Sequence, residues 1–327
     1  MFVFEKITIM NESRIFDLLE RYKKHFDKKD VFGCKVNGEW KVYSVDDYIN
    51  YSNLVSYGLM AMGLEKGDKI ATLSNNRPEW NFVDIGIMQA GYIHVPVYPT
   101  ISEEEHRYIL DHSQAAIVIV SDKMLYQRIA KIAEELPSIR AVYTFNDIPG
   151  AKSWKKILDE GKKHQENYQN QLNKIKQSII PEELATLIYT SGTTGTPKGV
   201  MLSHNNILSN AIASSKRQLL ESQHKVLSFL PLCHIYERMM NYHYQYKGIS
   251  IYYAENMGKI AENIRELKVD GFTTVPRLLE KVFDKIIEKG KALKGIKKAI
   301  FFWAVELGKK YELYNGNGFL YSLKLKI

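Results

Sequence analysis

Short apolar strands alternate with helical segments along the chain, and this alternation restricts the fold more than any other feature. Segment 115–120 contains only alanine, isoleucine and valine, which is typical of a strand covered on both faces in a parallel sheet. Apolar residues at helical spacing separate it from its neighbours. We therefore expect an α/β fold in which layered sheets are flanked by helices. Strands are expected at 69–73, 92–98, 115–120, 141–145, 226–230 and 249–253.

The sequence also predicts where several helices begin and end. Ser102 precedes three glutamates, a capping-box pattern that predicts a helix from there to about His112. Pro78 lies in the expected first turn of a helix that Gly91 ends. Apolar stripes predict two further helices toward the C-terminus. The first stripe is Leu278, Leu279, Val282, Phe283 and Ile286, and the second is Ile296, Ile300, Trp303 and Leu307.

One loop has the composition of a phosphate-binding site. A β-prone run at 185–189 leads into it, and its candidate ligand-binding residues are Thr190, Ser191, Gly192, Thr193, Thr194, Gly195, Thr196 and Lys198. Glycines let backbone N–H groups turn toward a ligand, hydroxyls add short donors, and lysine adds a mobile charge. The Walker pattern requires glycine directly before the lysine, whereas Pro197 precedes Lys198. A flexible linker would not carry a strand upstream and the apolar run 200–202 downstream, so we interpret the loop as a polyphosphate site.

Composition excludes several classes of protein. The chain has 327 residues, enough for one large or two ordinary domains, with 45% apolar and 25% charged residues, as in soluble globular proteins. The two cysteines form no disulfide or zinc-binding pattern, which fits a reducing, cytoplasmic location. No signal peptide and no apolar run of membrane-spanning length is recognised.

The net charge of +8 is concentrated near the C-terminus. Residues 285–327 contain ten lysines and three glutamates, a net charge of +7, so the rest of the chain carries only +1. No RNA-binding or DNA-binding motif accompanies this charge, and nucleic acid is therefore not expected as a partner. The favoured interpretation is a solvated helical face. A second interpretation places these lysines near an acidic segment, near CoA phosphates, or near anionic lipid in a peripheral membrane contact.

Four further segments, together with the loop, carry a resemblance to a known family. They lie at 74–80 (Ser-Asn-Asn-Arg-Pro-Glu-Trp), 95–100, 229–238 (Phe-Leu-Pro-Leu-Cys-His-Ile-Tyr-Glu-Arg) and 273–279. From about Ile15 onward the chain resembles long-chain fatty acyl-CoA synthetases of the bacterial type. These belong to the AMP-binding, adenylate-forming superfamily, which includes the luciferases, and the resemblance implies the large N-terminal domain of the acyl-CoA synthetase/luciferase-like fold. The loop is specific to the superfamily, and the segment 229–238 points to the long-chain branch.

The resemblance implies a fatty acid–CoA ligase that uses ATP, Mg²⁺ and CoA. In the first step a fatty acid carboxylate attacks ATP and releases pyrophosphate, and in the second CoA captures the acyl-adenylate. Lys198 and the loop donors would hold the β- and γ-phosphates, and Thr190 would approach the magnesium. His234 would line the carboxylate pocket as a hydrogen-bond donor. Lys198 and His234 are therefore the candidate catalytic residues.

Several residues near His234 have an alternative, structural interpretation. His234 itself could be a satisfied core histidine beside Cys233. Glu237 and Arg238 could equally form a surface pair, so they receive no catalytic role. Tyr236, Met239, Met240, Tyr242 and Tyr244 could line an acyl tunnel, although such a stripe is more often ordinary core.

The chain also departs from the family pattern. It contains no Tyr-Gly-x-Thr-Glu segment for adenine and magnesium, no later Thr-Gly-Asp segment for the ribose, and no C-terminal cap domain. We therefore expect a partial N-terminal AMP-binding domain over 1–327, with one lobe at about 1–180 and a phosphate-loop lobe at about 184–327. Such a truncated domain should be inactive alone. The rival interpretations are another adenylate-forming ligase, such as an acyl-AMP or aryl-CoA ligase, and a non-catalytic binding protein.

Overall fold

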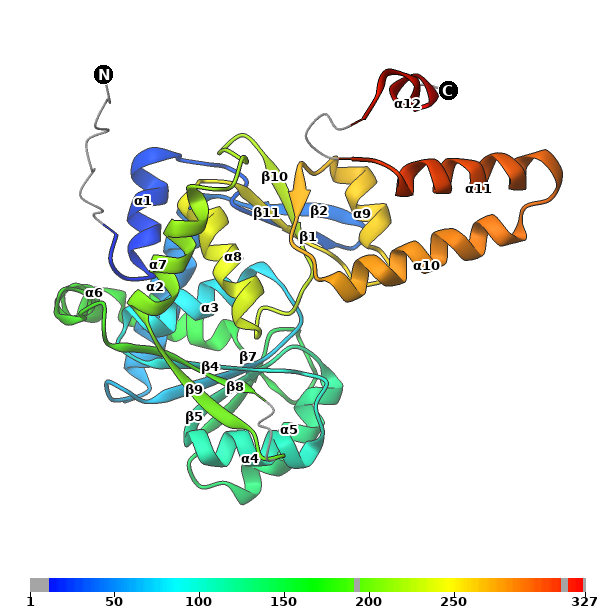
Figure 1. Ribbon diagram of the computed structural model, residues 1–327. Coiled ribbons are helices and arrows are strands. Elements are labelled where there is room, and N and C mark those ends of the chain that lie inside the picture. The colour runs from blue at the N-terminus through cyan, green and yellow to red at the C-terminus, as the bar shows by residue number, and fades with distance from the viewer. Residues whose placement is uncertain (1–11, 191–194, 313–316, 326–327) are drawn as a thin grey trace, which may run out of the picture. The chain divides into compact units, whose positions relative to one another are not determined.

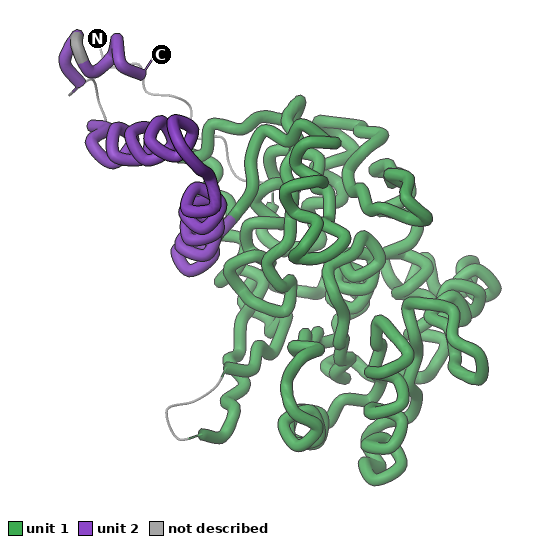
Figure 2. Tube along the Cα trace, turned by 90° about the vertical axis from the view of Figure 1, so that its right-hand side faces the viewer, with its two compact units in different colours: residues 1–273 green, residues 274–327 purple. Residues whose placement is uncertain are grey.

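The computed structural model describes residues 12–190, 195–312 and 317–325. These residues form two compact units that divide between Thr273 and Thr274, as Figure 2 shows in green and purple. Each unit is described separately below. The lobes predicted at about 1–180 and 184–327 stay a prediction.

The first unit contains a mostly parallel sheet, which has seven strands among the described residues. Strand β9 runs antiparallel to β8, and the other neighbouring strands are parallel (Figure 1). The predicted strands 69–73 and 115–120 are confirmed without a shift of boundary. In order across the sheet the strands are β7 (Lys152–Ser153), β6 (Ala141–Thr144), β5 (Ala115–Val120), β3 (Lys69–Leu73), β4 (Ile93–Val97), β8 (Leu184–Thr190) and β9 (Lys198–Ser203).

Helices cover both faces of this sheet, as wholly apolar strands require. Val118 and Val120 of β5 belong to one apolar cluster with α4 (Glu103–Ser113) and α5 (Lys123–Glu135). Ile117 and Ile119, which point to the opposite face, belong to a second cluster. This second cluster includes α2 (Val45–Ala61), α3 (Pro78–Gln89) and α6 (Lys155–Ser178). The predicted capping box at Ser102 is present, with its side chain accepting from Glu105 N–H and the Glu105 carboxylate accepting from Ser102 N–H.

The second apolar cluster continues into a five-stranded sheet of the same unit. Its strand order among the described residues is β12 (Gly271–Phe272), β10 (Lys225–Ser228), β11 (Ser250–Tyr253), β1 (Phe32–Val36) and β2 (Glu39–Tyr43). The helices α1 (Asp17–His25), α7 (His204–Ser215) and α8 (Ile235–Tyr246) contribute to the same cluster. Helix α9 (Ile260–Leu267) precedes β12. The fold class predicted from the sequence is thus confirmed.

The hairpin of β1 and β2 was not among the predicted strands. Its turn residues Asn37 and Gly38 have φ angles of +51° and +86°. Two successive positive φ angles define the type I′ turn, and Asn-Gly is its preferred sequence. The Asn-Gly pair in the sequence therefore predicts this hairpin, although the strand pattern used above does not include it.

The second unit is helical in its described part. It contains α10 (Pro276–Ala292), α11 (Gly295–Lys309) and α12 (Phe319–Lys324), so the two helices expected from apolar stripes are confirmed. Helix α10 leaves Leu279, Val282, Phe283 and Ile286 between 46% and 53% exposed. The sequence Asn-Gly-Asn-Gly at 315–318 predicts a turn after these helices, but Asn315 and Gly316 lie outside the described residues. Among the described residues of both units, no helix is both long and apolar enough to cross a membrane.

Candidate functional site

The β8–β9 hairpin holds the two ends of the candidate phosphate loop. Thr190, the last residue of β8, pairs in register with Lys198, the first residue of β9. Both residues are exposed, so the Thr190 hydroxyl and the Lys198 ammonium group can reach a ligand. Gly195 has a φ of +85°, a conformation that side chains rarely adopt, and Thr196 is exposed beside it. Ser191, Gly192, Thr193 and Thr194 lie outside the described residues, and their expected contacts stay predictions.

A cavity of about 400 Å³ adjoins the loop at the carboxyl ends of β4 and β8. Its lining includes Thr190 and Pro197 from the loop and His234 from the turn before α8. Apolar residues such as Val97 and Ile188 form further parts of its wall. Ligands of open α/β sheets bind at this edge, because loops leave the strands there. The fold thus brings together two of the predicted site residues, Thr190 and His234, while Lys198 lies across the hairpin from Thr190.

His234 is oriented by the start of helix α8. Its ring Nδ1 accepts a hydrogen bond from Tyr236 N–H at 3.2 Å, so His234 is the N-cap of the helix. A neutral imidazole whose Nδ1 accepts carries its proton on Nε2, which becomes a donor. The side chain is exposed at the cavity, so the core-histidine interpretation is wrong. Neighbouring Cys233 is buried instead, and burial raises the pKa of its thiol to about 12.

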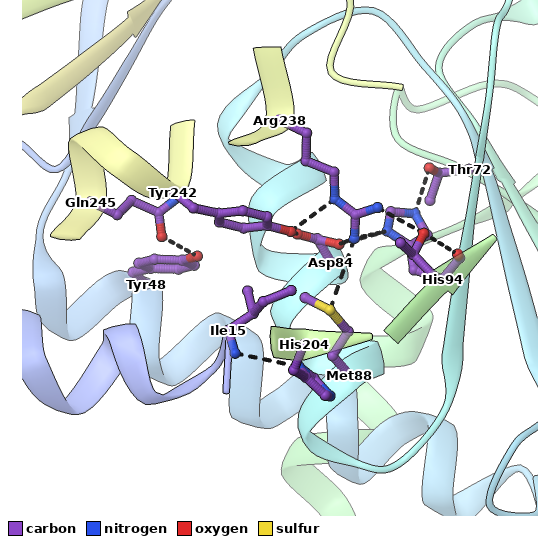
Figure 3. Close-up of polar contacts among 11 residues, drawn as sticks. Ile15, Tyr48, Thr72, Asp84, Met88, His94, His204, Arg238, Tyr242 and Gln245 are labelled. Atoms are coloured by element: carbon purple, nitrogen blue, oxygen red, sulfur yellow. Dashed lines mark hydrogen bonds and ion pairs between the residues drawn. The ribbon is translucent and has the colours of Figure 1, made fainter. Parts of the chain in front are cut away.

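Arg238 is fully buried, which corrects the surface-pair interpretation. Its guanidinium donates to Asp84 of α3 at 2.5 Å and to the Tyr242 hydroxyl at 2.8 Å (Figure 3). It also donates to the Thr186 hydroxyl of β8 at 2.7 Å. Asp84 accepts a second hydrogen bond, at 2.6 Å, from the ring of buried His94. Helix α8 is therefore bonded to the strand that leads into the phosphate loop.

The charges of this buried network are set by burial and by their partners. Burial raises the pKa of Asp84, but Arg238 and the ring of His94 outweigh it, so the carboxyl pKa lies below its ordinary value. Burial lowers the pKa of His94 and outweighs the attraction of Asp84, which leaves the imidazole neutral. Asp84 and Arg238 thus form one ion pair with no exposed surface.

Glu237 is also buried, with 1% of its surface exposed. The Ser228 hydroxyl of β10 donates to its Oε1 at 2.5 Å, and Asn241 Nδ2 donates to the same atom at 3.3 Å. Burial dominates over these donors and raises the pKa of Glu237 to about 7. These adjacent residues thus anchor α8 to two different sheets, Glu237 to the five-stranded sheet and Arg238 to the seven-stranded sheet.

The aromatic stripe of α8 is mostly core, as the favoured interpretation predicted. Tyr242 and Tyr244 are buried, with their hydroxyls bonded to Asp84 and to Thr273, respectively. Met239 and Met240 pack against the same core, while Tyr236 remains 42% exposed. None of these five residues lines the cavity beside the loop.

The described residues contain no cluster of three or more histidine, cysteine or carboxylate side chains suited to a metal ion. Thr190 fits the predicted magnesium role only in part. Its exposed hydroxyl is an oxygen donor of the kind that Mg²⁺ accepts, but it provides a single ligand. Substrate phosphates and water would have to complete an octahedral shell, as is usual for this ion.

Sequence comparison relates the chain to proteins of known activity. The family model described as AMP-binding enzyme matches residues 19–312. A long-chain-fatty-acid–CoA ligase of Xenopus laevis is 33% identical over 301 residues, which are 88% of this chain and 40% of that protein. A peroxisomal long chain acyl-CoA synthetase of Arabidopsis thaliana is 30% identical over 85% of this chain and 40% of its own length. The chain thus spans about 40% of the length of these curated relatives. Both relatives are eukaryotic, and the expected bacterial type stays a prediction.

Structure comparison shows the same fold in solved proteins. The adenylation domain of a carboxylate reductase from Mycobacterium chelonae aligns with a TM-score of 0.70 and 19% identity, over 88% of this chain and 50% of that chain. A red-emitting luciferase from Phrixothrix hirtus aligns with a TM-score of 0.69 and 20% identity, over 81% and 50%. At such identities the likeness concerns the fold alone. It matches the luciferase-like fold that was predicted.

Proposed function

The chain belongs to the family of AMP-binding enzymes, and on this premise we propose that it forms the phosphate- and carboxylate-binding part of a long-chain fatty acid–CoA ligase. The proposed enzyme uses ATP, Mg²⁺ and CoA to convert a fatty acid into acyl-CoA, AMP and pyrophosphate. One observation carries this proposal. Thr190 at the start of the phosphate loop and His234 at the start of α8 line one cavity with apolar walls.

In the proposed first step, a fatty acid carboxylate oxygen attacks the α-phosphorus of ATP. The bond from that phosphorus to the bridging oxygen breaks, and its electron pair leaves with pyrophosphate. His234 Nε2–H donates to the carboxylate and holds it in the cavity, while Lys198 neutralises charge on the β- and γ-phosphates. Such a reaction depends on positioning and charge stabilisation more than on covalent help from the protein. Bound Mg²⁺ would supply further charge neutralisation, with Thr190 as one oxygen ligand.

In the proposed second step, the CoA sulfur attacks the acyl carbon of the adenylate. AMP leaves with the electron pair of the broken carbon–oxygen bond, and the thiol proton passes to solvent. The pyrophosphate has departed by then, so Lys198 has no role in this step. This difference between the two steps makes the roles of the loop and of His234 separable.

Two alternative functions would give different results in the test described below. Another adenylate-forming ligase, of the acyl-AMP or aryl-CoA kind, would share the loop but differ in the acid that it accepts. A non-catalytic binding protein would bind phosphates without reaction. The apolar cavity wall and the names of the sequence relatives favour a fatty acid. A cytoplasmic location and a peripheral membrane contact through the basic region 285–327 stay predictions.

The test is ATP–pyrophosphate exchange, measured on this chain and on the longest open-reading-frame product that contains it. We expect palmitate-dependent exchange in the longer polypeptide, whereas this chain alone should bind tripolyphosphate without supporting exchange. Exchange with benzoate but not palmitate would favour an aryl-CoA ligase. Palmitate-dependent exchange without CoA acylation would favour an acyl-AMP ligase. Absence of exchange with every acid would favour the binding protein.

A further inference from the structure

We propose that Asn76 is a positioning residue for His234. This inference rests on the function proposed above, because it concerns how the carboxylate-binding histidine is held. Asn76 lies in the loop between β3 and α3, 158 positions before His234 in the sequence. It belongs to the Ser-Asn-Asn-Arg-Pro-Glu-Trp segment, to which the proposed reaction assigns no role.

The Asn76 side chain clamps the turn that carries His234. Its Nδ2 donates to the carbonyl oxygen of Leu230 at 2.7 Å, and its Oδ1 accepts from Leu232 N–H at 3.0 Å. A side-chain amide offers a donor and an acceptor side by side, so it can pair with two backbone groups of one turn. Leu232 is two residues before His234, and any shift of this turn therefore moves the start of α8.

The Leu232 side chain is buried in the core, but the backbone of the turn has few other hydrogen bonds. Pro231 has no N–H group to donate. His234 N–H donates to Pro231 O at 2.9 Å, which closes the turn on its helical side. On the strand side of the turn, the Asn76 amide is the hydrogen-bond partner of both Leu230 O and Leu232 N–H. Without Asn76 these two partly buried backbone groups would lose that partner. Buried backbone groups need such partners.

The clamp also connects two parts of the proposed site. The turn follows β10 of the five-stranded sheet, whereas Asn76 follows β3 of the seven-stranded sheet, which also contains β8 and Thr190. Next to Asn76, Arg77 fixes the loop through Glu79 at 2.9 Å and Asn146 at 2.8 Å. Asn76 therefore fixes the position of His234 relative to the sheet that carries the phosphate loop.

The chain offers a matched control in Asn75. It has the same side chain in the neighbouring position and is exposed. Asn75→Ala thus removes the same atoms from the same loop, outside the clamp. Asn76→Ala removes both bonds to the turn, together with a longer one of 3.4 Å from Asn76 Nδ2 to the Ser228 hydroxyl. Asn76→Asp keeps the acceptor for Leu232 N–H while removing the donor to Leu230.

The experiment compares these variants of this chain in two ligand titrations, with palmitate and with magnesium tripolyphosphate. Loss of the hydrogen bonds to the turn should weaken palmitate binding about tenfold or more in Asn76→Ala. Asn76→Asp should weaken it at least as much, because its carboxylate oxygen faces the Leu230 carbonyl oxygen acceptor to acceptor. Tripolyphosphate affinity should stay within about twofold of the wild type, and Asn75→Ala should change neither affinity. Equal losses for both ligands in Asn76→Ala would indicate general damage to the fold and overturn the inference, as would unchanged palmitate binding.

A second readout requires no ligand and therefore separates this inference from the proposed function. The Cε1–H NMR signal of His234 should shift or broaden in Asn76→Ala, and the Leu232 amide should exchange faster. The signals of buried His94 and His204 should not move. Faster exchange at Leu232 with an unchanged His234 signal would overturn the positioning role. If the wild-type chain binds neither ligand while Asn76→Ala still shows the predicted changes at His234 and Leu232, only the proposed function is contradicted.

Discussion

Replacing Glu237 by glutamine should make the protein more stable at neutral and alkaline pH. Glutamine has almost the same shape, can still accept from the Ser228 hydroxyl and cannot ionise. Burial raises the pKa of Glu237 from its ordinary value of 4.5 to about 7. Above pH 7 the folded protein must therefore hold a buried carboxylate, and its Oε2 has no hydrogen-bond partner among the described residues.

The sign and size of the effect follow from proton linkage. Between pH 4.5 and 7 the folded chain holds the Glu237 proton while the unfolded chain releases it, so the contribution of Glu237 to stability falls as pH rises. A shift of this size corresponds to about 3 kcal/mol, since each pKa unit is worth about 1.4 kcal/mol. The Glu237→Gln variant should gain up to this amount relative to the wild type between pH 4.5 and pH 8.

The assay is urea-induced unfolding of both proteins, followed by circular dichroism at several pH values. His204 contributes an opposite slope, because burial lowers its pKa to about 4 and its contribution is lost as pH falls below 6.5. The comparison cancels this slope, since both proteins contain His204. Glu134→Gln on the exposed surface of α5 controls for the loss of one charge. A stability difference between Glu237→Gln and the wild type that stays flat from pH 5 to pH 8 would refute the reasoning.

Three other predictions concern the buried network, nucleotide binding and the second unit. Arg238→Met should cost about 3–5 kcal/mol in unfolding free energy, because it leaves Asp84 buried without its partner, and the Asp84→Asn double mutant should recover part of this in a double-mutant cycle. Calorimetry on this chain should show similar affinities for ATP, GTP and tripolyphosphate, because only the phosphate contacts are expected here; strong adenine selectivity would contradict this. Hydrogen exchange in α12 should be fast in dilute monomer or show protection that increases with concentration, because its apolar residues Phe319 and Leu323, and Leu325 after it, are exposed. Full protection in a dilute monomer would count against both outcomes.

Short sequence patterns predicted those helices and strands whose formation depends on residues close together in the chain. The β3 and β5 strands and the capping box at Ser102 were predicted from their own residues, because apolar continuity and cap chemistry act over a few positions. The β1–β2 hairpin could have been predicted in the same way from Asn37 and Gly38. The five-stranded sheet nevertheless pairs strands that lie more than 180 residues apart in the sequence. No short sequence pattern can predict this strand order.

The candidate site was predictable only in part, for the same reason. The loop and His234 were identified through motifs, and the fold brings Thr190 and His234 to one cavity. The burial of Arg238 was not predictable, since Asp84 lies 154 positions away in the sequence. Adjacent acidic and basic residues ordinarily face solvent, and only tertiary partners on two different sheets draw Glu237 and Arg238 inward.

The most direct test of the proposed role of the loop is to measure the two half-reactions separately after Lys198→Ala. In the longest polypeptide that contains this chain, adenylation of palmitate should slow about ten- to hundredfold, the effect of losing one charge-assisted contact. Capture of preformed palmitoyl-adenylate by CoA should be unchanged, because the β- and γ-phosphates have already left. Thr193→Ala should show the same asymmetry. An equal loss in both half-reactions would contradict the account, because it would mean that the loop supports the fold and does not bind the departing phosphates.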